Sequence, residues 1–372
     1  MTKATAIDGM RGLSAQVVFL AHAIPFAFPD TTKAWFLHAI GHAAQIAVVT
    51  FFALSGFVIA STLRHRTLTG QFNVLDFAIR RVARIWPPYI VGLVLMLGLI
   101  VLEQSGFVIR RETANLPLDT SLASWARALG LFSYAGNDLV AALNNPVWSL
   151  RLEVRLYVIA ALAAVCFVSR GAVRWLTGLL IAYLVYKMSR LAFGLPACAI
   201  FCAGSVAALF GERAAHLSLV GLGAAAAAAT AIILWGHSIE HTALTGLMIA
   251  YGGLVAVGLS SLGKPLAADC GPIARQVCAT GVYSYTLYII HYPLLQALRA
   301  GLDLGTGVSW QEGLKLFGVV LLINGICCLV AKFAERTDFF TGLLAMALPN
   351  RIRAAFNFPL RRSIRVPADV SP

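Results

Sequence analysis

Long apolar stretches, separated by short polar connections, run through the whole chain. A helix that rises 1.5 Å per residue needs about 20 mostly apolar residues to cross the ~30 Å hydrocarbon core of a bilayer. Ten stretches approach that length, at 12–29, 43–62, 86–104, 147–168, 172–190, 195–211, 217–236, 243–262, 279–299 and 314–334. The pattern predicts an all-α, polytopic integral membrane protein with about ten transmembrane helices.

The composition agrees with this pattern and excludes a soluble enzyme. Hydrophobic residues make up 59% of the 372 residues and charged residues only 12%, whereas a soluble domain carries roughly 25% charged residues. The lipid bilayer is therefore an expected partner. A net charge of +13 would suggest nucleic acid in a soluble protein. Here the basic residues lie mostly between apolar stretches, so we expect no nucleic-acid partner.

The basic residues also predict how the chain is oriented. Of the 29 Lys and Arg residues, 19 fall on the side of the membrane that holds the N-terminus and 8 on the opposite side. The remaining two, Arg151 and Arg155, lie within the fourth span. The positive-inside rule then places both termini in the cytoplasm. We expect residues 1–340 to form the transmembrane domain and 341–372 a basic cytoplasmic tail. The longest connection, 103–146, is expected on the outer side.

Arg11 and His22 are two basic residues on the first predicted span. Eleven residues make about three helical turns, so both side chains share one face, separated by ~16 Å of rise. One interpretation makes Arg11 a topology anchor and His22 a hydrogen-bonded group between helices. The other makes them a functional site, because ionisable residues inside a membrane are costly and His is the usual general base near neutral pH.

A basic cluster precedes the third span, where Arg81 and Arg84 are three residues apart and share a helix face. Such residues anchor a helix at the cytoplasmic boundary. Their guanidinium groups also suit a phosphate clamp, since each binds phosphate oxygens in bidentate fashion. The residues alone leave both interpretations open.

Two later spans carry polar groups that need partners within the membrane. Glu153 and Tyr157 share one face of the fourth span, whereas Arg151 and Arg155 point elsewhere. A carboxylate surrounded by lipid requires a partner or a watery cavity. In the ninth span, Tyr285 precedes His291, which lies at a depth like that of His22. The two histidines are candidates to line one cavity, with inter-helix hydrogen bonding as the alternative.

Two other motifs carry less weight. The Ser55-Gly56 pair in the second span offers small residues that let helices approach closely, so we interpret Ser55 as a packing residue and not as a nucleophile. The string His237-x-x-Glu240-His241 matches a metallopeptidase pattern, and His38 and His42 also share a face. No third ligand accompanies either set, and we expect no metal.

Taken together, these motifs resemble the acyltransferase-3 family of integral-membrane acyltransferases. The resemblance covers roughly residues 6–335 and rests on five motifs in the family's order. They are Asp8-Gly9-Met10-Arg11-Gly12-Leu13 with His22, Phe51-Phe52-Ala53-Leu54-Ser55-Gly56-Phe57, Arg81-x-x-Arg84, Trp148-Ser149-Leu150-x-x-Glu153, and Tyr283-Ser284-Tyr285 through His291-Tyr292-Pro293. The chain departs from the family at Glu335-Arg336-Thr337-Asp338, where a Glu-x-Pro-like signature is common, and at Arg151 and Arg155.

The resemblance implies an O-acyltransferase that moves an acyl group, usually acetyl, from cytosolic acyl-CoA to a hydroxyl. The implied acceptor is a cell-surface glycan, a lipid-linked glycan or a secondary metabolite, and the expected location is the bacterial inner membrane. By position in the motifs, Arg11, His22 and Glu153 are the expected catalytic residues, with His22 as general base or transient acyl carrier. Arg81, Arg84 and Arg11 are expected to bind acyl-CoA. Trp148, Tyr157, Tyr285 and His291 are expected to bind substrate.

Two other classes of protein remain alternatives at this stage. A multi-span transporter or flippase of lipid-linked glycans would also need intramembrane polar residues, although spans one to five and six to ten show no internal repeat. A structural partner in polysaccharide assembly, with no activity of its own, is the third possibility.

Overall fold

The computed structural model describes residues 3–28, 34–106, 118–132, 138–210, 218–260, 276, 278–302 and 309–349. Every regular element among them is helical. In chain order they are α1 (Lys3–Ala27), α2 (Ala34–Leu68), α3 (Val74–Gln104), α4 (Leu122–Leu129), α5 (Leu139–Leu143), η1 (Asn145–Val147), α6 (Trp148–Val168), α7 (Gly171–Ser189), α8 (Gly194–Phe210), α9 (Ser218–Trp235), η3 (Gly236–Ser238), α10 (His241–Ser260), η5 (Gly281–Tyr283), α12 (Ser284–Leu302), α13 (Trp310–Ala334) and α14 (Thr337–Ala347).

The all-helical prediction is confirmed for the described residues, and each predicted apolar stretch lies largely on one helix. Five segments are long and apolar enough to cross a membrane by length and composition: Trp35–Leu68, Val74–Gln104, Val220–Ser238, His241–Leu259 and Trp310–Ala347. The total of about ten spans and the cytoplasmic termini stay predictions. Helix α14 continues through the predicted domain boundary at residue 340, and residues 350–372 of the predicted tail lie outside the described residues.

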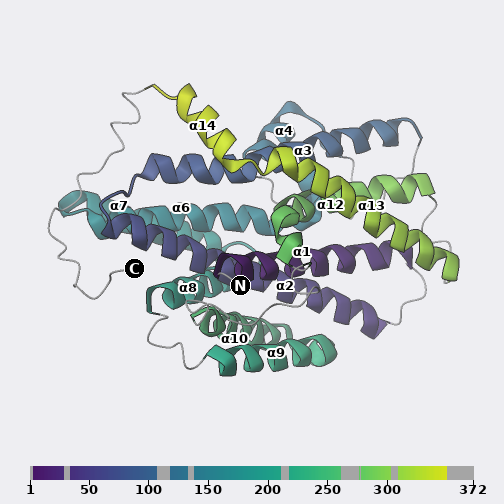
Figure 1. The fold of residues 1–372 in the computed structure, drawn as a ribbon, viewed down its shortest axis with the longest axis horizontal. Helices are drawn as coiled ribbons and strands as arrows, with labels where there is room; N and C mark the ends of the chain where they lie inside the picture. Colours follow the sequence, from purple (N-terminus) through teal and green to yellow (C-terminus); the bar gives the residue numbers. More distant parts are fainter. Residues whose placement is uncertain are drawn as a thin grey trace.

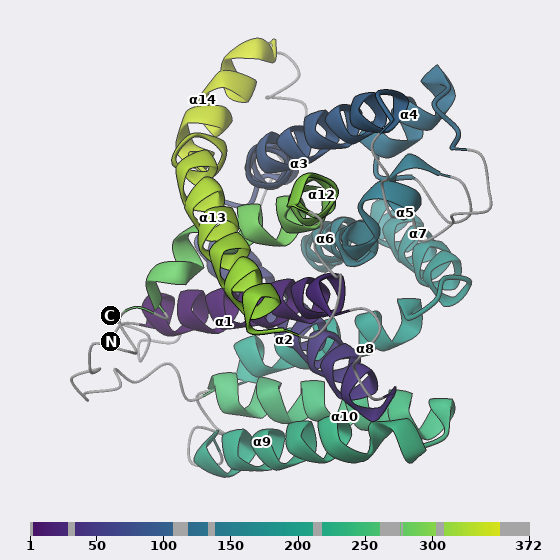
Figure 2. The same ribbon diagram turned by 90° about the vertical axis from the view of Figure 1, so that its right-hand side faces the viewer.

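Most of the long helices lie along the long axis of the molecule (Figure 1). Viewed along that axis, α12 occupies the centre, with α1, α3, α6 and α13 around it (Figure 2). Helices α8, α9 and α10 form a second group that packs against α2. Helix α12 therefore contacts the helices that carry most of the candidate site residues.

Part of the connection before α6 packs into the bundle, while the placement of 103–146 on the outer side of the membrane stays a prediction. Residues 107–117 and 133–137 lie outside the described residues, while α5 and η1 are almost fully buried. The Asn144 amide donates to the Ile289 carbonyl of α12 at 2.9 Å, and the Tyr89 hydroxyl of α3 donates to the Ala128 carbonyl of α4 at 2.7 Å. Irregular backbone inside a membrane protein needs such internal partners. Helix α6 consequently begins beside α12, inside the bundle.

Helices α2 and α8 approach each other closely through two glycines. A Cβ atom added to Gly56 would lie 2.0 Å from the Phe201 carbonyl oxygen, and one added to Gly204 would lie 2.1 Å from the Ala53 carbonyl oxygen. The Ser205 hydroxyl donates to the Gly56 carbonyl at 3.2 Å. The predicted packing role of the Ser55-Gly56 segment is therefore confirmed for Gly56.

Replacement of Gly204 by Ala should destabilise the bundle, because the new methyl group meets backbone that cannot move independently. We expect Gly204→Ala to lower the free energy of unfolding by about 1–3 kcal/mol. Gly223→Ala on α9 is the control, since nothing lies within 4 Å of its added Cβ. Thermal unfolding in detergent measures both, and equal melting temperatures for the two variants would contradict the close contact.

Candidate active site

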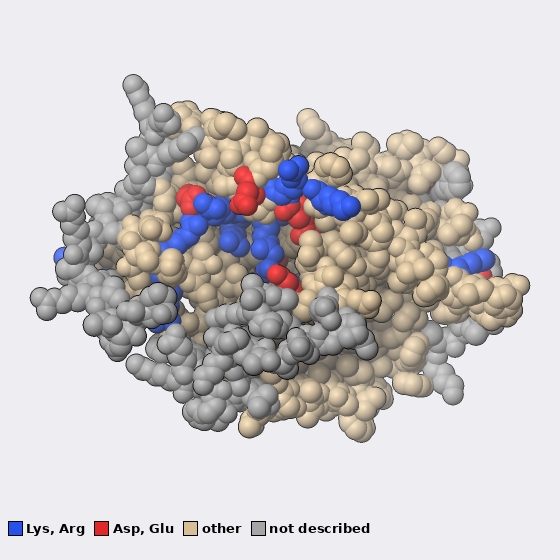
Figure 3. Space-filling model, viewed as in Figure 1, with Lys and Arg blue, Asp and Glu red and all other residues tan. Residues whose placement is uncertain are grey.

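A small cavity lies where α1, α2, α3, α6 and α12 meet. Its free volume is about 30 Å³, which is room for one or two water molecules. Charged side chains gather over a hollow on the face shown in Figure 3, whereas most of that face is uncharged. The cavity is lined by Arg11, Val48, Phe51, Phe52, Ser55, Arg84, Ser149, Glu153, Ser284, Tyr285 and Tyr288.

The Glu153 carboxylate is the acidic group of this cavity. Its Oε1 atom accepts a hydrogen bond from the Ser55 hydroxyl at 2.6 Å and a second from the Tyr157 hydroxyl. Arg11 and Arg84 line the same cavity and supply positive charge. The carboxylate thus has the partners that an ionised group needs inside an apolar bundle, and they come from α1, α2, α3 and its own helix α6.

Glycines on α1 and on η5, the turn just before α12, allow these two segments to pack closely beside Arg11. A Cβ atom on Gly12 would lie 2.2 Å from the Thr280 hydroxyl oxygen, and one on Gly281 would lie 2.2 Å from the Asp8 carbonyl oxygen. Only glycine permits backbones to approach this closely. The Asp8-to-Leu13 motif therefore both supplies Arg11 and brings Tyr285, four residues after Gly281, to the same cavity.

The two arginines of the basic cluster stack on aromatic rings. The Arg81 guanidinium carbon lies 5.4 Å from the Phe77 ring centre and 5.7 Å from that of Tyr157. The Arg84 guanidinium carbon lies 5.9 Å from the Tyr285 ring centre. Such cation–π contacts fix the planar groups in orientation. Arg84 lines the cavity, whereas Arg81 lies behind Tyr157 and is not among the lining residues.

His22 and His291 lie side by side, as their predicted depths suggested. His22 Nδ1 is 2.8 Å from the Val18 carbonyl oxygen, and His291 Nδ1 is 2.9 Å from the Leu287 carbonyl oxygen. Because a carbonyl oxygen only accepts, each Nδ1 carries the hydrogen, and in a neutral ring each Nε2 then carries a lone pair. His291 Nε2 lies 3.4 Å from His22 Nδ1. His22 is therefore held in the tautomer that can accept a proton at Nε2.

The histidine pair is outside the lining of the Glu153 cavity, but α12 connects the two. Tyr288 lines the cavity, and its ring centre lies 6.3 Å from that of His291. Its hydroxyl donates to the Pro146 carbonyl at 2.7 Å and also contacts the Ser149 hydroxyl. Tyr285, Tyr288 and His291 follow each other at three-residue spacing, so each ring lies about 60° further around the helix than the one before it. They form a row of rings from the cavity to His22.

Two residues have contacts that the sequence did not predict. Ser55 was interpreted as packing, yet it lines the cavity and donates to Glu153. Tyr288 was not singled out, although its spacing from Tyr285 and His291 was a usable signal. Trp148, expected to bind substrate, lines a second cavity together with Arg151 and Arg155, and its role stays a prediction.

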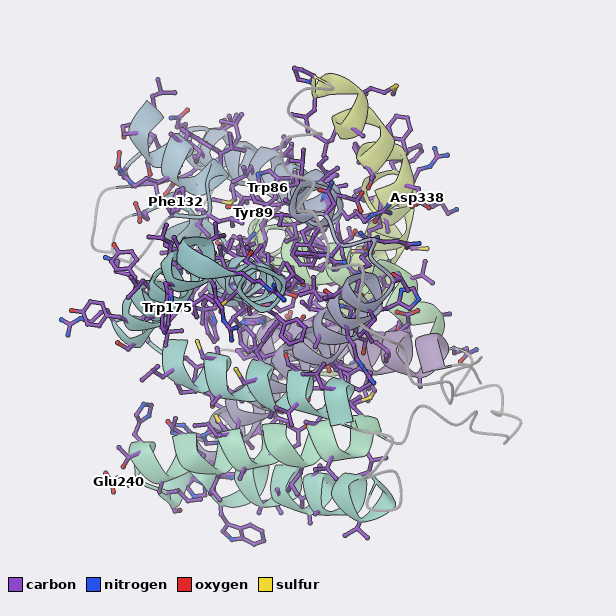
Figure 4. All side chains as sticks on the ribbon, turned by 90° about the vertical axis from the view of Figure 1, so that its left-hand side faces the viewer. Trp86, Tyr89, Phe132, Trp175, Glu240 and Asp338 are labelled. Carbon is purple, nitrogen blue, oxygen red and sulfur yellow. The ribbon has the colours of Figure 1, made fainter. Side chains whose placement is uncertain are left out.

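The candidate metal motifs stay apart from this site. Within the part of the chain that the structure describes, no group of three or more His, Cys, Asp or Glu residues is arranged to hold a metal ion. Glu240 of the His237-x-x-Glu240-His241 string lies at the edge of the bundle, far from the centre where Tyr89 is buried (Figure 4). Its carboxylate accepts a hydrogen bond from the nearby Thr242 hydroxyl instead.

Removal of the Glu153 charge should weaken the bundle. A Glu153→Gln variant keeps an oxygen that can accept from Ser55 and Tyr157, but both hydrogen bonds lose their charge assistance, worth about 1 kcal/mol each. We expect a loss of roughly 2 kcal/mol in the free energy of unfolding, seen as a lower melting temperature in detergent. Glu240→Gln, at an exposed residue, is the matched control. Unchanged melting of the Glu153 variant would show that this carboxylate does not hold the helices together.

Comparison with known proteins places the chain in a family. A family model described as "Acyltransferase domain" matches residues 5–332. An O-acetyl transferase of Shigella phage Sf6 is 23% identical over 320 residues, which cover 82% of this chain and 89% of the relative. "Protein 2 in picA locus" of Rhizobium radiobacter is 28% identical over 155 residues, covering 40% of this chain and 75% of the relative. No solved structure matches.

The family match spans nearly all of the helical bundle, including each motif from Arg11 to Pro293. It favours an enzyme over the transporter and the structural partner that the sequence alone left open. The helices that are long and apolar enough to cross a membrane indicate that this enzyme is a membrane protein. The chain belongs to the acyltransferase-3 family and is a membrane acyltransferase.

Proposed function

We propose that the protein transfers an acetyl group from cytosolic acetyl-CoA to a hydroxyl of a cell-surface glycan or of its lipid-linked precursor, at the inner membrane of a bacterium. The observation that carries the proposal is the row of Tyr285, Tyr288 and His291, which joins a cavity with two guanidinium groups to His22. The name of the phage relative supports acetyl as the group and a hydroxyl oxygen as the acceptor.

The donor end of the site is assigned to the basic residues. Arg11 and Arg84 line the cavity, and Arg81 lies behind it against Tyr157. Guanidinium groups bind phosphate oxygens strongly and in bidentate fashion, so these residues bind the phosphates of acyl-CoA. The pantetheine arm then runs along α12, past Tyr288, and brings the thioester to His22. The cavity has room for only one or two waters, so its side chains move apart when the donor enters.

The chemical step is assigned to Nε2 of His22. The acceptor hydroxyl gives its proton to this nitrogen while its oxygen forms a bond with the thioester carbonyl carbon. The carbon–sulfur bond then breaks, and the leaving thiolate takes the proton back from the imidazolium. The products are the acetyl ester and free CoA, and His22 returns to its neutral form. Glu153 balances the charge of Arg11 and Arg84 whenever the donor is absent.

A second route uses the same residues in two stages. His22 Nε2 attacks the thioester carbonyl carbon, the carbon–sulfur bond breaks, and CoA leaves as its thiolate while the acetyl group stays on the imidazole. The acceptor oxygen then bonds to the acetyl carbon, the carbon–nitrogen bond breaks, and the hydroxyl proton passes to the thiolate. Rapid-quench labelling with radioactive acetyl-CoA and no acceptor separates the routes. Label trapped on His22 supports the two-stage route, and failure to trap label on the protein excludes it.

Replacement of His22 tests the proposed function. We expect His22→Ala to lower acetylation of the acceptor by about 100-fold to 10,000-fold, the usual contribution of a positioned acid–base group. Mass spectrometry of surface glycans and metabolites, with and without the gene, identifies the acceptor and supplies the readout. His65→Ala, at an exposed position near the end of α2, is the control.

Both variants must be compared at equal protein level in the membrane. Normal acetylation in cells that produce His22→Ala would contradict the assignment of the chemical step to His22. Loss of acetylation in both variants would point to a general defect in folding or insertion.

A further inference from the structure

A second cavity lies on another face of α6, with a free volume of about 220 Å³. Its walls come from the first two turns of α6 and from the connection between α7 and α8. Two of its lining residues are arginines, which are rare inside membrane proteins and usually functional there. The lining residues are Trp148, Arg151, Leu152, Arg155, Leu191 and Ala192.

The geometry of α6 separates the two cavities. Ser149 and Glu153 are four residues apart and face the first cavity. Arg151 and Arg155, also four apart, line the second. At 100° per residue, each arginine is about 160° around the helix from Glu153. The two guanidinium groups therefore serve a separate site and not the charge balance of Glu153.

Aromatic side chains connect the cavities around the end of α6. Phe52 lines the first cavity, and its ring centre lies 6.4 Å from that of Phe193. The Phe193 ring centre lies 5.9 Å from that of Trp148, which lines the second cavity. Phe193 adopts φ +59°, a left-handed conformation that is unfavourable for a bulky residue. This strained backbone holds its ring between the other two.

We propose that the second cavity binds an anionic group, a carboxylate or a phosphate, carried by the acceptor whose hydroxyl is acetylated. Two arginines one helical turn apart can bind such a group through several charge-assisted hydrogen bonds. The row of rings from Trp148 to Phe52 offers an apolar surface on which the body of the acceptor lies. Arg151 and Arg155 are thus specificity residues, which select acidic over neutral acceptors. The inference rests on the proposed acyltransfer for the identity of the acceptor.

Binding of three matched probes tests this subsite without any acyl donor. The probes are phenyl β-D-glucoside, phenyl β-D-glucuronide and phenyl β-D-glucoside 6-phosphate, which differ only at carbon 6. The full-length protein is held in phosphatidylcholine nanodiscs, and dissociation constants are measured by titration. We expect at least one anionic probe to bind the unmodified protein about tenfold tighter than the neutral glucoside, as charged hydrogen bonds worth about 1.5 kcal/mol would give.

The Arg151→Gln/Arg155→Gln variant should lose that preference, so that all three probes bind with similar constants. An Arg151→Lys/Arg155→Lys variant, which keeps the charge but not the bidentate geometry, should keep part of it and guards against misfolding of the glutamine variant. The control is Arg170→Gln/Arg174→Gln, which removes two exposed charges at the other end of the same hairpin and should retain the full preference.

Equal binding of the three probes to the unmodified protein would overturn the proposal, as would a preference that survives the glutamine substitutions. A further arm uses nanodiscs that contain phosphatidylglycerol. Native mass spectrometry shows whether this lipid stays bound to the unmodified protein and is lost from the glutamine variant, and titration shows whether it displaces the probes. If all three results are found, a lipid headgroup occupies the site and the acceptor assignment is wrong. Because none of these measurements uses acetyl-CoA, their failure is distinguishable from failure of the His22 mechanism.

Discussion

The half-buried Glu153 carboxyl group inside an apolar bundle is the constraint on which the rest of the site depends. A carboxylate in such a place is costly unless opposite charge and hydrogen-bond donors surround it. Those groups come from separate parts of the chain: Arg11 on α1, Ser55 on α2, Arg84 on α3 and Tyr157 on α6. To satisfy this one carboxylate, the four helices must hold a fixed register. The same register aligns the polar faces that form the cavity.

Helix α12 connects the cluster around Glu153 with the histidine pair. It lies at the centre of the molecule, where Tyr285 faces Arg84 and His291 faces His22. The buried segment before α6 fixes it from the other side, through Asn144 and the carbonyl of Pro146. Under the proposed function, a donor bound at one end of the path along α12 reaches a histidine at the other. One face of α6 lines the donor cavity, and the opposite face, with Arg151 and Arg155, holds the acceptor.

The sequence predicted the helices and most of the polar groups, because apolar length and helical spacing are local properties. Arg11 and His22 were predicted to share one face of a helix, and His291 was predicted to lie at the depth of His22.

The pairing of Ser55 with Glu153 was not predictable, since it depends on a contact between residues 98 positions apart. Nor was the folding of Asn144 into the bundle, because its partner Ile289 lies 145 positions further along the chain. That Trp148 lines a cavity separate from that of Glu153 was not predictable for the same reason, since its neighbour Phe193 lies in the connection between α7 and α8.

The central claim is that acyl-CoA binds with its phosphates in the Arg11–Arg84 cavity and its pantetheine arm along α12, so that its thioester lies at His22. Photo-crosslinking tests it most directly, with a short diazirine-bearing acyl-CoA and peptide mass spectrometry of the labelled protein. The account predicts label on the peptides that hold His22 or residues 285–291, and competition by excess acetyl-CoA. Label confined to α9, α10 or α13, with α1 and α12 unlabelled, would contradict it.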